Sequence, residues 1–148
     1  MSGVCRLDSR RYRFPTEAEW EYACRAGTTT PFAFSAGLST LQANFDGRDA
    51  SGAGPHRAAT TPVGMFQPNA WGLFDLHGNV WEWCTDWYGE YPTDNVTDPQ
   101  GLEFGDFRVL RGGSWSNPRS SCRPACRYRF APADRHPDFG FRVCLAAD

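Results

Sequence analysis

The chain has 148 residues, enough for one domain with a buried core. A formal net charge of −2 provides no general attraction to nucleic acid or to a membrane surface, and no apolar run is long enough for a transmembrane helix. The first residues lack the apolar stretch of a signal peptide, which predicts a cytoplasmic protein or export by a route that this chain does not encode. Aromatic residues make up 15% of the chain, so Trp and Phe should supply much of the core.

One helix is predicted near the start of the chain, from Pro15 to Arg25. Thr16 and Glu19 form a capping-box pattern at its beginning, and Gly27 is a stop signal at its end. The helix should bury Trp20, Ala23 and Cys24, and it should turn Glu17 and Glu21 away from the core.

The rest of the chain indicates short strands joined by many loops. Residues 28–59 predict a loop with a turn at 44–47, and residues 61–66 and 72–74 predict short strands. A buried strand is expected at 80–88, where Trp81, Trp83 and Trp87 alternate with Glu82 and Asp86. Two further core strands are expected at 107–111 and 140–144, separated by an irregular segment rich in Arg and Pro, 116–138. The predicted fold class is α+β.

Three motifs support a family assignment: residues 13–27, residues 72–83, and residues 108–115 closed by Gly-Phe-Arg-Val at 140–143. Together they resemble the formylglycine-generating enzyme family, the sulfatase-modifying-factor version of the C-type lectin fold. The resemblance covers nearly all of residues 1–148. It implies one loop-rich domain with short antiparallel strands and one or two helices. Relatives carry a further N-terminal portion ahead of the first motif, so we expect that portion to be missing here.

The resemblance also implies calcium. Its main site would use four residues that match family ligands, two through side chains and two through backbone carbonyls: Asp75, Gly78, Val80 and Glu82. Calcium takes six to eight oxygen ligands of this kind. The alternative is that Asp75 is a turn residue and Glu82 pairs with an arginine. A second, weaker site would use Asn44 and the Phe45 carbonyl, but its downstream acidic ligand has no counterpart. We expect His77 to be a hydrogen-bonding loop residue rather than a metal ligand.

The cysteines bear on catalysis. They stand at positions 5, 24, 84, 122, 126 and 144. The resemblance implies bridges from Cys5 to Cys144 and from Cys24 to Cys122 or Cys126, with reduced, buried thiols as the alternative. Active relatives hold copper(I) with two cysteines separated by four residues. The matching positions here are 117 and 122 counted from Trp115, or 114 and 119 counted from Gly140, and neither count gives two cysteines. Copper and formylglycine-generating activity are therefore not expected.

The same fold serves as a display scaffold in the variable proteins of diversity-generating retroelements, whose varied segment corresponds to residues 112–142. Within it lies an assorted set of aromatic, small and polar residues predicted to bind a ligand: Trp115, Ser116, Asn117, Ser120, Tyr128, Phe130, Ala133, His136 and Asp138. Interleaved arginines should pair with Glu82, Asp86, Asp106 or Asp134, or stack on Trp rings, and so hold the loop backbone.

The predicted function is a non-catalytic module on this scaffold that binds a protein or other macromolecule, and neither nucleic acid nor a membrane. The alternative is a metal-dependent oxidoreductase of the same family, using copper or non-haem iron, which would be complete only with additional parts. Two interpretations of the segment 112–142 also stay open: the varied segment of a retroelement variable protein, or ordinary loop residues of a family member that is not diversified.

Overall fold

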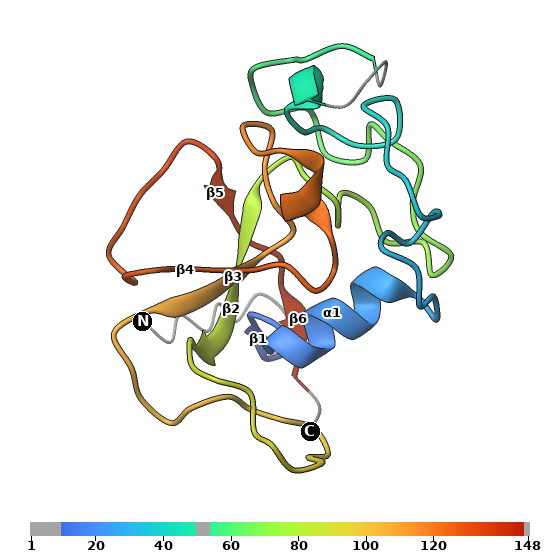
Figure 1. Cartoon of the computed structure of the whole chain (residues 1–148). Helices are drawn as coiled ribbons and strands as arrows, with labels where there is room; N and C mark the ends of the chain where they lie inside the picture. The colour runs from blue at the N-terminus through green and yellow to red at the C-terminus, as the bar shows by residue number, and fades with distance from the viewer. Residues whose placement is uncertain (1–9, 50–53, 147–148) are drawn as a thin grey trace.

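The computed structural model describes residues 10–49 and 54–146. The elements of these residues are, in chain order, β1 (Tyr12–Arg13), α1 (Glu17–Arg25), the 3-10 helix η1 (Gly47–Asp49), β2 (Trp81–Trp87), β3 (Arg108–Arg111), the 3-10 helix η2 (Arg119–Cys122), β4 (Arg127–Phe130), β5 (Phe139–Gly140) and β6 (Cys144–Leu145). Long connections join them, as the glycine and proline content predicts (Figure 1).

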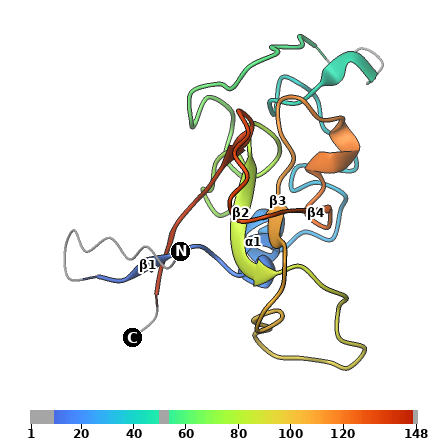
Figure 2. The same ribbon diagram turned by 90° about the vertical axis from the view of Figure 1, so that its left-hand side faces the viewer.

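The main sheet has the strand order β4-β3-β2-β5. Strands β2, β3 and β4 are antiparallel neighbours, whereas β5 lies parallel to β2, with Trp81 opposite Phe139. Helix α1 packs against β2 and β3. Strands β1 and β6 form a separate two-stranded sheet, and Figure 2 shows β1 to one side of the main sheet. The expected α+β class is confirmed for the described residues.

Helix α1 has the predicted caps. Thr16 Oγ1 accepts from the Glu19 amide at 3.1 Å, and the Glu19 carboxylate accepts from the Thr16 amide at 2.8 Å. The helix ends where Ala26 enters the left-handed region, just before Gly27. The predicted exposure of Glu17 is wrong. Its side chain is buried, because Arg127 binds both of its carboxylate oxygens.

Strand β2 forms where it was predicted, but its two faces differ from the expected pattern. The face with Glu82, Cys84 and Asp86 is fully buried, whereas Trp83 and Trp87 are half-buried. The two carboxylates are tolerated inside because each has donors: Arg142 and an indole for Glu82, and the Glu17 amide for Asp86. Burial raises the pKa of Asp86.

Three other predictions need correction. Residues 61–66 and 72–74 are turns and loops, because Asn69 accepts from the amides of Trp71 and Leu73 and folds the chain locally. The segment 116–138 contains β4, which pairs along its whole length with β3. The strand expected at 140–144 divides into β5 and β6, which belong to different sheets.

Two apolar clusters form the core. One joins α1 to the sheet and comprises Trp20, Cys24, Leu76, Cys84 and Val109; the other lies under the long loop and comprises Phe32, Leu38, Ala43, Phe45 and Cys122. The buried His77 contacts both: its Nδ1 lies 2.8 Å from the Cys122 carbonyl, and the Cys24 Sγ lies 3.9 Å from its ring nitrogens. Its Nε2 also accepts from the Ala33 amide at 3.1 Å. This confirms a hydrogen-bonding role. Among the described residues, no helix has the length and apolar character needed to cross a bilayer.

Candidate functional site

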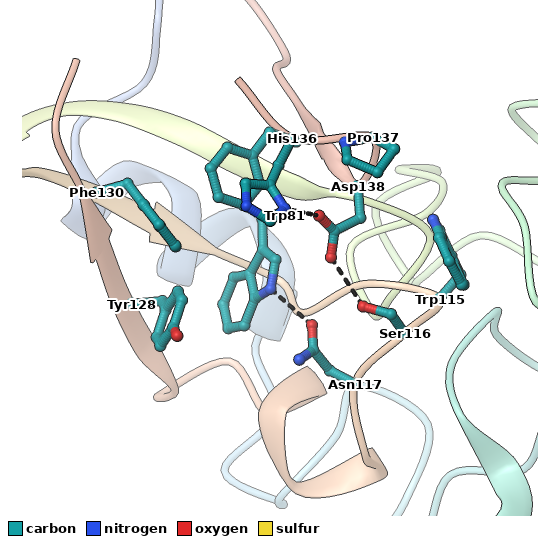
Figure 3. Close-up of a pocket in the computed structure, with 10 residues that line it drawn as sticks. Trp81, Trp115, Ser116, Asn117, Tyr128, Phe130, His136, Pro137 and Asp138 are labelled. Atoms are coloured by element: carbon teal, nitrogen blue, oxygen red, sulfur yellow. Dashed lines mark hydrogen bonds and ion pairs between the residues drawn. The ribbon is translucent and has the colours of Figure 1, made fainter. Parts of the chain in front are cut away.

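A surface cleft of about 270 Å³ opens between the loop after β3, strand β4 and the segment leading into β5 (Figure 3). Its lining consists of Trp81, Trp115, Ser116, Asn117, Tyr128, Phe130, His136, Pro137, Asp138 and Phe139. The lining includes every predicted ligand-binding residue except Ser120 and Ala133. The sequence analysis missed two site residues, because it assigned Trp81 to a core strand and placed Phe139 between the irregular segment 116–138 and the strand expected at 140–144. They come together through the parallel pairing of β2 with β5.

One wall of the cleft is aromatic. Trp81 stacks on Tyr128, with ring centroids 5.1 Å apart and an interplanar angle of 19°. Phe130 contacts Tyr128 at 5.4 Å and Phe139 at 4.7 Å, and His136 stacks on Phe139 at 4.9 Å. These rings present a continuous apolar surface with π faces.

Strand alternation separates the aromatic residues of β4 from its arginines. Tyr128 and Phe130 face the cleft, whereas the guanidinium groups of Arg127 and Arg129 lie 4.5 and 4.8 Å from the ring of Tyr88, which does not line the cleft. The positive charges of β4 therefore point away from the cleft, toward Tyr88.

The other end of the cleft is polar. The Asp138 carboxylate Oδ2 accepts from the hydroxyls of Ser114 and Ser116, both at 2.8 Å. The Trp81 indole N–H donates to Asn117 Oδ1 at 2.7 Å. Figure 3 shows Asp138 pointing between His136 and Ser116, with Trp115 at the edge. This network connects the aromatic wall to the loop after β3.

The backbone of that loop is held from several sides. Gly113 has a φ of +73°, and a Cβ there would lie 2.8 Å from Cys122 Sγ, so this position requires glycine. The Trp115 amide donates to the Asn79 carbonyl at 3.0 Å, and the Asn117 carbonyl accepts from the Asp46 amide at 2.8 Å. The cleft side chains therefore project from a fixed frame.

Arginine ion pairs and arginine–tryptophan stacking also hold the backbone that carries the cleft, as predicted. Arg142 Nε and NH2 bind the two oxygens of Glu82 at 2.5 and 2.7 Å, and the guanidinium of Arg108 lies 3.6 Å from the centre of the Trp87 ring. Two acidic residues that were predicted as arginine partners, Asp86 and Asp134, instead accept hydrogen bonds from backbone amides.

The residues of the main predicted calcium site are not arranged to bind an ion, because oxygens of Asp75, Gly78 and Glu82 already accept hydrogen bonds. The Glu82 carboxylate is bound by Arg142 and by the Trp20 indole, which donates at 2.6 Å. The Gly78 carbonyl accepts from the Val80 amide at 3.0 Å. Asp75 has a φ of +57° and accepts from a backbone amide, as a turn residue does. The geometry thus agrees with the alternative, an arginine partner for Glu82, and calcium at this loop stays a prediction.

The second calcium position has an atom that suits a cation better. Asn44 Nδ2 donates to the Ala59 carbonyl at 2.9 Å, whereas Asn44 Oδ1 is buried and accepts no hydrogen bond from the part of the chain that the structure describes. A buried carbonyl oxygen without a donor is a reasonable ligand for a hard cation. Calcium there, with the Phe45 carbonyl, also stays a prediction.

The bridge implied from Cys24 is absent, because Cys24 is a free thiol that contacts the Leu76 carbonyl at 3.5 Å. The other implied bridge involves Cys5, which lies outside the described residues. Burial raises the pKa values of the Cys24, Cys84 and Cys126 thiols. These thiols behave as small hydrophobic groups rather than as reactive thiolates.

Comparison with known proteins identifies the family. The model of the sulfatase-modifying factor enzyme 1-like domain matches residues 3–147. The chain is 40% identical, over 92% of its length, to the formylglycine-generating enzyme of Streptomyces coelicolor and covers 47% of that enzyme. It is also 40% identical, over 88% of its length, to the serine/threonine-protein kinase pkn1 of Chlamydia caviae and covers 20% of that protein. The chain thus spans half or less of these relatives.

Solved structures support the same family assignment. Treponema denticola variable protein 1 superposes with a TM-score of 0.76 and 35% identity, over 90% of this chain and 47% of that one. PvdO from Pseudomonas aeruginosa gives a TM-score of 0.75 and 35% identity, over 93% and 54% of the two chains. The fold is therefore the α+β fold of formylglycine-generating enzymes, and the chain belongs to the family of sulfatase-modifying factor enzyme 1-like domains.

Proposed function

We propose that this domain is a non-catalytic ligand-binding module that contacts a protein or other macromolecule through the cleft shown in Figure 3. The observation that carries the proposal is the meeting of side chains from three segments, 115–117, 128–130 and 136–139, on one fixed backbone. At about 270 Å³ the cleft is below the usual range for drug-sized ligands, so it suits one side chain of a larger partner. The likeness to a protein described as a variable protein supports a binding role.

The second candidate function is a metal-dependent oxidoreductase, supported by the 40% identity to a formylglycine-generating enzyme. The residues at the copper-binding positions do not favour it. Counted from the C-terminal motif, these positions hold Ser114, whose hydroxyl binds Asp138, and the exposed Arg119; counted from Trp115, they hold Asn117 and Cys122. Neither count supplies the pair of thiolates that copper(I) prefers.

Peptide display tests the proposal directly. Peptides selected on the wild-type protein should bind at least tenfold more weakly to a Tyr128→Ala/His136→Ala variant, because central aromatic residues dominate interfaces of this kind. A Val96→Ala/Phe104→Ala variant is the matched control, since both of its residues are exposed and lie outside the cleft. Equal binding to the two variants would contradict the proposed site.

Copper loading separates the two candidate functions. The protein is loaded with copper(I), and oxygen consumption is followed with a cysteine-containing peptide. The Cys122→Ala/Cys126→Ala variant is the control. We expect no oxygen consumption that depends on these thiols. Turnover that is lost in the double variant would establish the enzyme instead.

A further inference from the structure

The buried carboxylate of Asp138 has an unused acceptor. The residue is 8% exposed, and its Oδ2 accepts from two serine hydroxyls. Its Oδ1 is buried, and no donor among residues 10–49 and 54–146 forms a hydrogen bond with it. The Nδ1 of His136 lies 3.5 Å from Oδ1, and the His136 side chain is 54% exposed at the mouth of the cleft. A buried carboxylate is costly unless it is paired, so this oxygen favours a cationic donor.

The rest of the cleft also favours a cation. Its lining contains no arginine, and the chain contains no lysine. Arg127 is bound to Glu17, and the Arg129 guanidinium lies over the rings of Tyr88 and Phe107. The charge of the cleft is therefore set by Asp138. The half-exposed ring of Tyr128, backed by Trp81, adds attraction for a cation.

We infer that the cleft receives the cationic side chain of a lysine or arginine from a protein partner. Its N–H groups donate to Asp138 Oδ1 in place of the His136 contact, and its aliphatic stem lies along Tyr128. The exposed His136 ring moves aside to admit it. This inference rests on the proposed binding function and names the chemistry of the ligand.

The probe is n-butylammonium, with neutral n-butanol of the same shape as the reference. The Trp81 indole N–H signal is followed by ¹H–¹⁵N NMR during titration, because Trp81 lines the cleft and its N–H donates to Asn117. We expect n-butylammonium to move this signal with a dissociation constant at least tenfold lower than that of n-butanol. The same preference is expected for n-butylguanidinium, which mimics arginine.

Two variants test the assignment of Asp138. Asp138→Asn keeps an acceptor for the serine hydroxyls but loses the charge, and it should remove the preference for the cation. Asp134→Asn is the matched control, because it makes the same charge change nearby while Asn can still accept from the Ala131 amide. It should keep the preference within twofold. If Asp138→Asn does not fold, Tyr128→Leu replaces it, since Tyr128 is 48% exposed and its loss should weaken cation binding at least threefold.

Equal binding of n-butylammonium and n-butanol would overturn the inference. An Asp138→Asn variant that keeps the cation preference would also overturn it. So would a Tyr128→Leu variant that binds n-butylammonium as tightly as the wild type does. These failures differ from a failure of the proposed function. Display-selected peptides that bind at the cleft but contain no lysine or arginine would contradict the cation inference alone. Selected peptides that bind outside the cleft would contradict both the proposed binding function and the cation inference.

Discussion

Replacing Arg142 by alanine should destabilise the fold strongly, because it leaves the Glu82 carboxylate buried without its cation. The Glu82 side chain is 7% exposed, and both of its oxygens accept from Arg142. Removing one partner of a buried ion pair costs about 3–5 kcal/mol. Since the Arg142 side chain is itself 25% exposed, water can reach the vacated space, and we expect the lower end, about 3 kcal/mol.

For a domain of this size, such a loss should lower the melting temperature by about 6–12 °C. Differential scanning calorimetry measures this shift, and urea unfolding gives the free energy independently. Arg119→Ala is the matched control, because Arg119 is exposed on η2, and it should change the free energy of unfolding by less than about 0.5 kcal/mol. If Arg142→Ala were no more destabilising than Arg119→Ala, the ion pair would not hold the frame.

Further predictions concern stability, pH, calcium and the cleft. Glu17→Gln removes the charge that binds Arg127 and should lower the free energy of unfolding by about 3 kcal/mol in urea; a loss below 1 kcal/mol would contradict this. Burial lowers the pKa of His77, so the unfolded chain binds the proton more readily. Stability should therefore fall as the pH drops below about 6.5, by at most about 1.4 kcal/mol per pH unit, and parallel pH profiles for the wild type and His77→Gln would refute this. Adding EGTA should lower the melting temperature of the wild type but not of Asn44→Ser, if Asn44 Oδ1 binds calcium. Tyr128→Ala should cost less than about 1 kcal/mol in thermal unfolding yet weaken selected peptides at least tenfold, since its ring is half exposed at the cleft.

Local signals predicted the local features of this fold well. The capping box at Thr16 and Glu19 depends on residues three positions apart, and it forms as the sequence indicates. Strand β2 follows from the alternation of tryptophan with acidic residues, and β3 contains the buried apolar pair Val109 and Leu110. The segment that supplies most of the cleft was found from its assorted composition and from the family motif that precedes it.

The remaining features depend on partners that are distant in the sequence. The helical pattern predicts that Glu17 faces solvent, but Arg127, 110 positions away in the sequence, binds its carboxylate inside the protein. Strand β4 was missed because its alternation of arginine with tyrosine and phenylalanine covers only four residues within a segment rich in Arg and Pro, and its strand form depends on pairing with β3. The contribution of Trp81 to the cleft requires the parallel pairing of β2 with β5, which no local pattern encodes.

The central claim is that ligands bind at the cleft between β4 and the loop after β3. The most direct test follows the six tryptophan indole N–H signals by ¹H–¹⁵N NMR while a display-selected peptide is added. We expect the signals of Trp81 and Trp115, which line the cleft, to move first and furthest, whereas that of Trp71, exposed beside Tyr22, should stay in place. Changes centred on Trp71, with Trp81 and Trp115 unmoved, would contradict it.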